Sequence, residues 1–468
     1  MRISLFALAV GLAVAMSSCH SNTADPPKSG STSSQPWFDG TRFVKDGEVG
    51  TKWGKSVATD GYGNVYAVGW VEYPYRQGRS ISRSEPNWST VFLSKFDPAG
   101  SLLWNVSWDG GVDALAVNSK GDIIVQGGFQ GVTDFDPGRG VFRLGSWRGF
   151  GQEGSNTYIS RFNSEGHFLW ARETGRSIHE LNAPRGVAID GIGNSYVLND
   201  ELVIYDPRGN VVRSLGEFSD VLTVDEAGNI YEMSATGSGV PGFTAGSSQR
   251  LASIRLRKAD PEGNTLWLVD WTGLTDALAA AVTYSSGGGV YVIARFSGTI
   301  DLDPGPGLIE KTFIPESVPT YDSFGFLTSI PFVYFLAKFR ADGTFEWALT
   351  FDEGIFPQAI ESDGLGNAYL AGNYRGEVDL DPGPAVLEST TDPTNRLLDF
   401  FRLKLDASGR LVWARTSEIT RSNEGGRSLA ADDNGFTYMV GGVWPDKSHY
   451  DFMGRSDIYV RRFSPDGD

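Results

Sequence analysis

Three short segments place two aspartates on either side of one apolar residue and continue into Pro-Gly. These segments are 134–138, 301–305 and 379–383. Alternate side chains of an extended chain point the same way, so each pair could bind calcium. Calcium takes about six to eight oxygen ligands, however, and each segment offers two carboxylates. The sequence favours turns in which Asp accepts backbone N–H groups, Pro restricts φ and Gly takes a positive φ at 138, 305 and 383. The weak calcium candidates are Asp134, Asp136, Asp301, Asp303, Asp379 and Asp381.

Other motifs that carry chemistry are incomplete. Residues 50–56 are one residue too short for a Walker-type phosphate loop. His20, His167, His179 and His449 lack metal-ligand spacing. No Gly-x-Ser-x-Gly nucleophile elbow occurs. We therefore expect no cofactor and no metal, and we favour a protein that is not an enzyme.

Two interleaved repeats organise the chain. The first is a turn related to Gly-Asn-x-Tyr, and its copies begin at Gly63, Gly121, Gly193, Gly228, Gly289, Gly366 and Gly435. The second is an apolar residue, a polar turn with Gly and an extended stretch that usually carries Trp, as from Phe96 to Trp104. Glycine permits the positive φ angles of tight hairpins. Each repeat therefore predicts four antiparallel strands.

Seven repeats of four strands predict an all-β chain folded as a seven-bladed β-propeller over residues 36–468. The last repeat ends at Asp468, where its fourth strand should begin, and a strand-like segment at 36–44 precedes the first repeat. We expect this N-terminal segment to supply the missing strand, since that closes the ring and removes two open sheet edges.

The Gly-Asn-x-Tyr turns, the Asp-x-Asp-Pro-Gly copies and the turn-to-Trp segments resemble the bacterial seven-bladed β-propeller repeat family, which includes exported lipoproteins. The turn-to-Trp segments also look like the tryptophan-docking repeats of quinoprotein dehydrogenases, whose rings have eight blades. The resemblance implies the fold and an exported protein. It implies no particular function, because propellers serve binding, scaffolding and catalysis alike.

The N-terminus has the features of a targeting segment. Arg2 precedes an apolar run from Ile3 to Met16, as in a signal peptide over residues 1–18. Cys19 is the only cysteine and follows a lipobox-like sequence, so we expect it to carry lipid. Residues 19–35 then form a lipid-attached flexible tether. The protein is expected at the bacterial envelope, on the outer membrane; cleavage after Ala15 would instead release a secreted protein.

The formal charge of −17 opposes binding to polyanions. We therefore expect no nucleic-acid partner, contact with the membrane through the lipid anchor alone, and a monomer. The partner would be a protein or a glycan.

Charged residues begin most of the first strands. Counting eight residues back from each turn glycine selects Lys55, Asp113, Arg185, Asp220, Gln358 and Arg427, with Ala281, or Ala280 if the fifth blade has an extra residue. This ring could bind a small polar ligand at one mouth of the channel. The alternative is that these residues pair with neighbours and are hydrated.

Long connections between second and third strands should leave the blades at one face, because alternate turns of an antiparallel sheet lie at opposite ends. Their aromatic residues are candidate ligand contacts. These are Tyr73, Trp88, Trp147, Phe150, Tyr321 and Trp444. We predict a cell-envelope binding or scaffold module that presents these loops. The alternatives are loops that bury their rings locally, and an envelope hydrolase or lyase at the channel mouth.

Overall fold

The computed structural model describes residues 51–72, 89–146, 148–149, 152–153, 155–177, 186–199, 201–216, 219–236, 251–315, 332–391, 398–417, 428–443 and 457–468. In these ranges the chain is all β, with no helix. The same ranges hold no helix with the length and apolar character that a bilayer crossing needs.

The strands form seven blades, each an antiparallel sheet. Blade one is β1 (Thr51–Thr59), β2 (Val65–Glu72), β3 (Ser89–Phe96) and β4 (Leu102–Asp109). Blade two is β5 (Ala114–Val117), β6 (Ile123–Gln130), β11 (Ser155–Phe162) and β12 (Phe168–Ser177). Blade three is β13 (Gly186–Ile189), β14 (Ser195–Leu198), β15 (Leu202–Tyr205) and β16 (Val211–Leu215).

The second half of the chain repeats this plan. Blade four is β17 (Val221–Val224), β18 (Ile230–Thr236), β19 (Ala252–Ala259) and β20 (Thr265–Leu274). Blade five is β21 (Asp276–Tyr284), β22 (Gly289–Asp301), β24 (Val333–Arg340) and β25 (Phe345–Thr350). Blade six is β26 (Ile355–Ser362), β27 (Ala368–Tyr374), β30 (Asp399–Leu405) and β31 (Leu411–Ser417). Blade seven, as described, is β32 (Leu429–Ala431), β33 (Thr437–Val443) and β34 (Asp457–Phe463).

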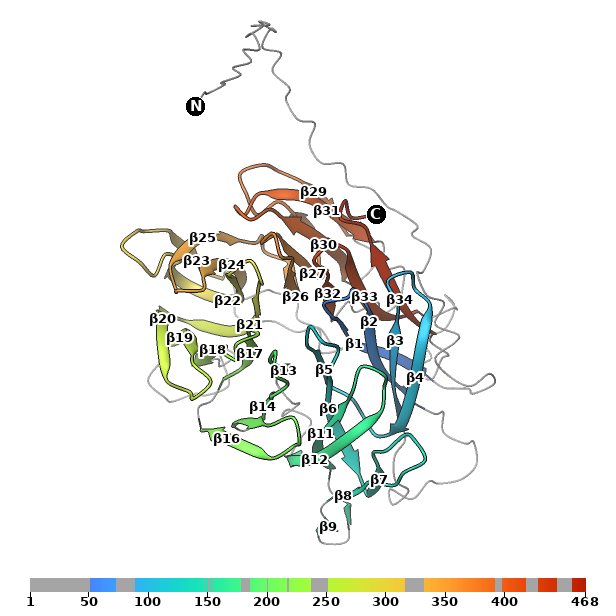
Figure 1. The fold of residues 1–468 in the computed structure, drawn as a ribbon. Coiled ribbons are helices and arrows are strands. Elements are labelled where there is room, and N and C mark those ends of the chain that lie inside the picture. Colours follow the sequence, from blue (N-terminus) through green and yellow to red (C-terminus); the bar gives the residue numbers. More distant parts are fainter. Residues whose placement is uncertain are drawn as a thin grey trace, which may run out of the picture.

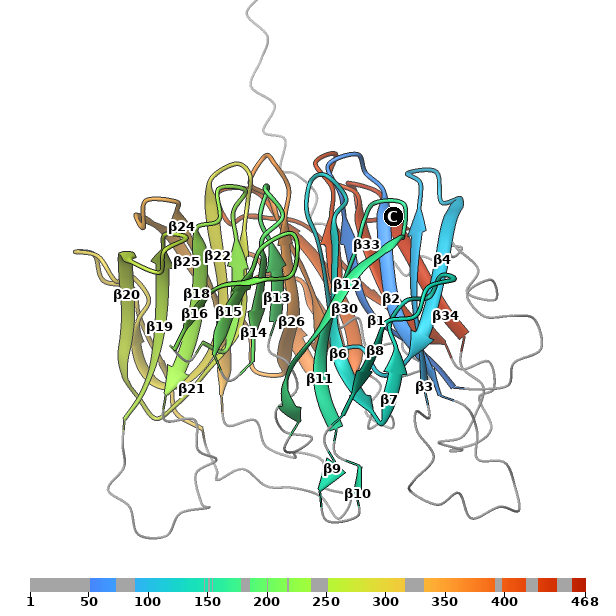
Figure 2. The same ribbon diagram turned by 60° about the horizontal axis from the view of Figure 1, so that its bottom comes forward.

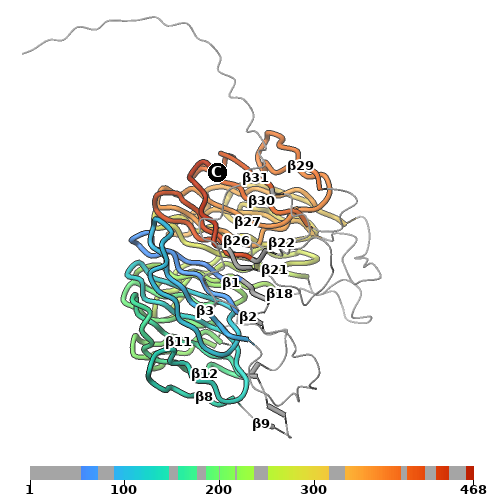
Figure 3. The backbone as a smooth tube through the Cα atoms, turned by 90° about the vertical axis from the view of Figure 1, so that its right-hand side faces the viewer, coloured from blue at the N-terminus to red at the C-terminus, as the bar shows by residue number. Residues whose placement is uncertain are grey.

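The blades close into a ring, which confirms the seven-bladed β-propeller. The first strand of each blade contacts the first strands of its neighbours, and β1 contacts β32, β33 and β34. Figure 1 shows these first strands around the centre. Figures 1 and 3 both show blade one, in blue, beside blade seven, in red. All short turns between strands one and two, and between three and four, lie at one end (Figure 2). We call this end the plain face and the opposite end the loop face.

An aspartate three residues before the turn glycine explains the first repeat in five of the seven blades, and Asn118 and Ser285 take its place in blades two and five. Asp60 Oδ1 accepts the N–H groups of Tyr62 and Asn64, and Asp60 Oδ2 accepts the Tyr66 hydroxyl at 2.9 Å. Gly63 completes the turn with a φ of 76°. In four other blades a tyrosine hydroxyl donates to the turn carboxylate in the same way, and the acceptors are Asp190, Asp225, Asp363 and Asp432. The Tyr of the repeat is therefore a buried partner of its own turn.

The repeat tryptophan joins a blade to the next at five interfaces of the described chain. Trp104 Nε1 donates to the Ser164 carbonyl at 3.1 Å, and Lys95 Nζ donates to the same oxygen at 3.2 Å. A Cβ on Gly166 would lie 2.8 Å from the Trp104 ring, so only glycine fits over it. The same indole bond joins Trp170 to Pro207, Trp267 to Ala341, Trp347 to Ala407 and Trp413 to Pro465. We call this contact the inter-blade latch.

The N-terminal strand expected at 36–44 lies outside the described residues, so it stays a prediction. Blade one has the turn of a latch acceptor, with Pro98 two residues before Gly100. By analogy with the other interfaces, Trp37 should donate to Pro98.

Deleting residues 20–34 should leave thermal stability nearly unchanged, whereas deleting residues 20–49 should lower the melting temperature by more than about 5 °C, because it opens two sheet edges. Trp37→Ala should cost about as much as Trp413→Ala, roughly 3–5 kcal/mol. Calorimetry of the purified variants measures both. Equal melting of the two deletions, or a neutral Trp37→Ala, would show that this segment does not close the ring.

Candidate functional site

The described members of the ring expected at the channel mouth lie at irregular positions of the innermost strands. Register shifts fall at Lys55 in β1, Ala280 in β21 and Gln358 in β26. Asp113 occupies the equivalent place, since its N–H bonds Gln126 O while the Gly111 N–H bonds Gly128 O. A bulge adds one residue and re-aims its side chain. The sequence left Ala280 and Ala281 open, and the structure selects Ala280.

Glycine opposite the bulge explains why these strands bend where they do. A Cβ on Gly127 would lie 2.0 Å from Gly111 O, and a Cβ on Gly372 would lie 2.2 Å from Phe356 O. Only glycine lets the bulged backbone approach its partner strand this closely. The scaffold of the mouth therefore repeats, while the bulge side chain differs from blade to blade.

Lys55 and Asp113 bring blades one and two together at the mouth. Lys55 Nζ lies 3.8 Å from Asp113 Oδ1 and 5.8 Å from the centre of the Trp70 ring. Burial raises the pKa of the Asp113 carboxyl above its ordinary value, and Lys55 offsets only part of that rise. Both side chains remain about one-quarter exposed, so a ligand could reach them.

The other positions of the predicted ring differ from one another in their contacts and exposure. The Asp220 N–H bonds Met233 O, which matches the Asp113 pattern, and Asp220 Oδ2 accepts the Ala235 N–H at 2.7 Å. Gln358 is exposed. Arg185 and Arg427 lie outside the described residues. The structure therefore shows one charged pair at the mouth, and it leaves the alternating ring untested.

The predicted loop contacts Tyr73, Trp88, Trp147, Phe150, Tyr321 and Trp444 also lie outside the described residues, as does Cys19. What the structure does show is where their loops begin and end. Each connection leaves the second strand of a blade at the loop face and returns to the third strand there. The β9 (Arg148–Gly149) and β10 (Gln152–Glu153) hairpin of blade two extends beyond the blades on this side (Figure 2).

The Asp-x-Asp-Pro-Gly segments form hairpins in these connections. They lie after β7 (Val132–Asp134), which pairs with β8 (Arg143–Gly145), after β22, whose end pairs with β23 (Glu310–Phe313), and after β28 (Glu377–Asp379), which pairs with β29 (Glu388–Thr390). The residue between the two aspartates is buried in each case: Phe135, Leu302 and Leu380. These parts of the long connections therefore pack into the core instead of forming a recognition surface.

The carboxylates of the hairpins accept backbone N–H groups. Asp134 Oδ1 accepts from Asp136 and Phe142, and Asp136 Oδ1 accepts from Gly138. Asp301 with Asp303, and Asp379 with Asp381, repeat this arrangement. Within the described ranges no three His, Cys, Asp or Glu side chains gather to hold a metal. Calcium binding itself is untested.

The expected positive φ at Gly138, Gly305 and Gly383 is wrong, because none of these glycines lies in the left-handed region. The steric demand falls two residues later. A Cβ on Gly140 would lie 2.0 Å from Asp136 Oδ2, and a Cβ on Gly307 would lie 2.1 Å from Asp303 Oδ2.

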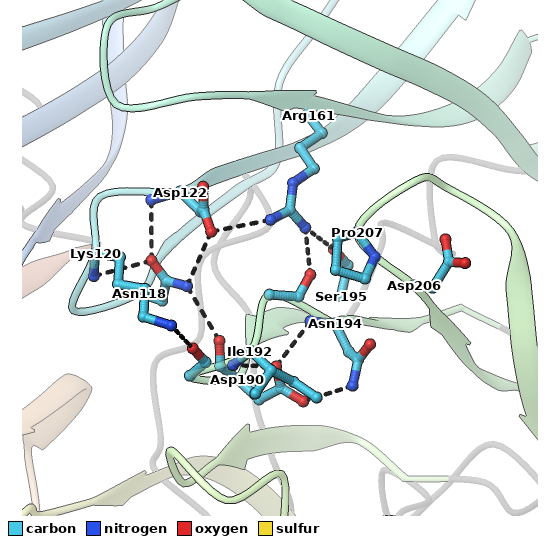
Figure 4. A network of polar contacts seen from close by, with 12 residues as sticks. Asn118, Lys120, Asp122, Arg161, Asp190, Ile192, Asn194, Ser195, Asp206 and Pro207 are labelled. Carbon is cyan, nitrogen blue, oxygen red and sulfur yellow. Dashed lines mark hydrogen bonds and ion pairs between the residues drawn. The ribbon is translucent and has the colours of Figure 1, made fainter.

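The plain face uses its polar groups internally, as Figure 4 shows for blades two and three. Arg161 lies 3.1 Å from Asp122 and 3.4 Å from the Ser195 hydroxyl. Asn118 Nδ2 donates to Asp190 O at 3.1 Å, and Lys120 Nζ donates to Gly191 O at 2.6 Å. The polar groups of this network are therefore bonded to one another, while Tyr62, Ile192 and Leu365 on the same face are exposed.

Glu361 is a residue that the sequence analysis missed. It lies on β26 directly opposite Tyr369. The residues at this level in the other six inner strands are all small: Ala58, Ala116, Ala188, Thr223, Thr283 and Ala430. Protein surrounds Glu361 while solvent still reaches it, and burial raises the pKa of its carboxyl from 4.5 to about 7. The sequence did carry a signal for this residue, because the other six repeats have Ala or Thr at the position of Glu361.

Comparisons with known proteins find only a weak structural likeness. No protein-family model matches the chain, and no curated protein matches it. Hydrazine synthase of Kuenenia stuttgartiensis aligns with 85% of this chain and 95% of its own, at 11% identity and a TM-score of 0.43. A protein of unknown function from Dyadobacter fermentans aligns over 90% and 99%, at 13% identity and a TM-score of 0.38. A gluconolactonase from Xanthomonas campestris aligns over 66% and 82%, at 12% identity and a TM-score of 0.32. At these values the likeness carries no argument about activity.

Glu361→Gln should stabilise the fold at pH 8 and have little effect near pH 4.5. Because the folded pKa of about 7 exceeds the ordinary 4.5, the favourable contribution is complete below pH 4.5 and lost as pH rises through 7. The difference at pH 8 should be on the order of 2–3 kcal/mol. Urea denaturation of both proteins at several pH values measures it. A difference that does not change with pH would rule out the raised pKa.

Proposed function

We propose that this chain is a binding or scaffold module whose ligand, a protein or glycan, engages the loop face around the channel mouth. The observation that carries the proposal is the repeated bulge. Five innermost strands present Lys55, Asp113, Asp220, Ala280 and Gln358 at equivalent positions. A constant backbone with a variable side chain is the arrangement expected of a recognition surface on a rigid scaffold.

The two faces differ in a way that supports this choice. Every plain-face turn is short, and the turn carboxylates accept bonds within their own turns. The connections that vary in length, and the bulges, both lie at the loop face. A ligand at the mouth would meet the Lys55–Asp113 pair and the Trp70 ring together, which suits a polar group attached to an apolar surface.

A second candidate function is a hydrolase or lyase at the same mouth. It is favoured by one observation, the partly buried Asp113 carboxyl with a raised pKa beside Lys55. Such a pair has the properties of an acid and base in catalysis. Turnover of a glycan or peptide library that Asp113→Asn abolishes would establish this function in place of simple binding.

Lys55→Ala combined with Asp113→Ala should reduce partner recovery from envelope extracts by roughly tenfold, the effect of about 1.4 kcal/mol. Trp147→Ala combined with Trp444→Ala should do the same. The control is Tyr62→Ala combined with Leu365→Ala, since these plain-face side chains are 74% and 79% exposed. Quantitative mass spectrometry of the recovered partner is the readout. If the control pair loses the partner while both loop-face pairs keep it, the ligand binds the plain face.

We further propose that the protein is exported and attached to the envelope by lipid on Cys19, and that residues 19–35 tether the ring. The sequence supports this through the apolar leader and the single cysteine that follows it. The tether would let the loop face reach ligands at a distance from the bilayer.

Cys19→Ala should move the protein from the detergent phase to the aqueous phase in a phase-partition experiment, because the lipid is its only membrane contact. The wild-type protein, expressed with its leader in a bacterial host, should partition into detergent. Identical partitioning of the two proteins would show that Cys19 carries no lipid and would favour the secreted form.

A further inference from the structure

The ring contains one carboxylate at the level where its inner strands are otherwise lined by small side chains. Glu361 shares that level with Ala58, Ala116 and Ala430, and with the hydroxyls of Thr223 and Thr283. Thr283 Oγ1 donates to Glu361 Oε2 at 3.4 Å. Glu361 lies on β26, one of the innermost strands, and its side chain is partly exposed. We propose that the centre of the ring binds a primary ammonium group, with Glu361 as its counter-charge.

Glu361 has no cation of its own among the described residues. No ion pair joins it to a lysine or arginine there, and no positive charge acts on its carboxyl; the hydrogen bonds from Thr283 and the Ser362 N–H are its polar support. An enclosed carboxylate without a paired cation is costly to keep ionised. A ligand that brings a positive charge removes that cost, so the site favours a cation.

The neighbours of Glu361 select the kind of cation. Thr283 donates its proton to Glu361, which leaves hydroxyl lone pairs free to accept from a ligand, and Thr223 adds a second hydroxyl at the same level. A primary ammonium has three donors and suits one carboxylate with hydroxyl acceptors. A divalent metal would need more oxygen ligands, and the described residues gather no third acidic or imidazole group here.

Among the described residues, no other charged group is seen to act on the Glu361 carboxyl. Tyr369 on β27 donates to Asp363, and Tyr438 on β33 donates to Asp432, so these two carboxylates belong to the plain-face turns. On β21 the nearest ionisable side chain is Tyr284, and β32 presents Leu429, Ala430 and Ala431. Lys55, Asp113 and Asp220 lie three positions away, roughly 10 Å along the strands. The charge state of Glu361 itself should therefore set the pH dependence.

The probe is 1,4-diaminobutane, a thin ligand with a primary ammonium at each end, titrated calorimetrically into the full-length protein. Binding should be measurable at pH 8 and at least about tenfold weaker at pH 5.5, where Glu361 is protonated and the amine is not changed. Glu361→Gln should weaken binding at pH 8 by at least about tenfold, and Thr283→Val by roughly threefold with the pH dependence retained. Butyltrimethylammonium, which has the charge without the donors, should bind more weakly than the diamine.

Glu262→Gln is the matched control, because it makes the same change on an exposed plain-face turn and should leave binding unaltered. Glu361→Asp retains the charge and is the conservative variant. Melting curves of all variants at pH 5 show whether a loss of binding in Glu361→Gln comes from misfolding. A peptide ending in lysine distinguishes a protein side chain from a free amine as the source of the ammonium group. Equal binding to Glu361→Gln and wild type, or affinity that does not change with pH, would overturn the proposal. The inference is independent of the loop-face proposal, since Glu361→Gln should still retain that partner.

Discussion

The ring depends on one repeated contact, the bond from a tryptophan indole to a turn carbonyl of the next blade. Each blade is a twisted sheet that could slide against its neighbour, since apolar faces alone do not specify a register. The bond from Trp267 Nε1 to Ala341 O adds a directional contact to the apolar packing between blades four and five. Lys258 Nζ reaches the same oxygen and lies 4.9 Å from the centre of the Tyr231 ring, so the lysine links the latch to the tyrosine turn.

The inter-blade latch makes the turns of the plain face alike. The side chains that differ most between blades therefore lie elsewhere. A turn that must supply a carbonyl, a glycine and a capping aspartate has few positions left to change. The loop-face ends of the same strands are not under this constraint. The bulge residues there can be Lys, Asp, Ala or Gln without disturbing the backbone, as Lys55, Asp113, Ala280 and Gln358 show. Blade three is an exception, because it lacks the tryptophan and has Leu215 beneath Gly263.

Sequence reasoning predicted the blade count and strand order because periodic turns and strands are local signals. Counting from the turn glycine follows the register of one hairpin, so Lys55, Asp113, Asp220 and Gln358 fall at equivalent places in the described strands. Sequence reasoning could not choose between Ala280 and Ala281, because that choice needs the identity of the turn glycine, which is Gly288 with a φ of 88°. It assigned a positive φ to Gly138, which this glycine does not adopt. Backbone angles in such a hairpin follow from side-chain packing, which one sequence does not show.

Glu361 shows a different limit of prediction from sequence. Along its own strand it reads as one polar residue in Ile355–Ser362, and nothing local marks it. Glu361 stands out only when the blades are compared, because the equivalent positions are alanine or threonine. Ring closure then brings these seven inner strands around one space. Burial in that space raises the pKa of the carboxyl. An ionised carboxyl with a raised pKa weakens the fold, so stability alone does not account for Glu361 at this position, and a cation bound beside it would offset that cost.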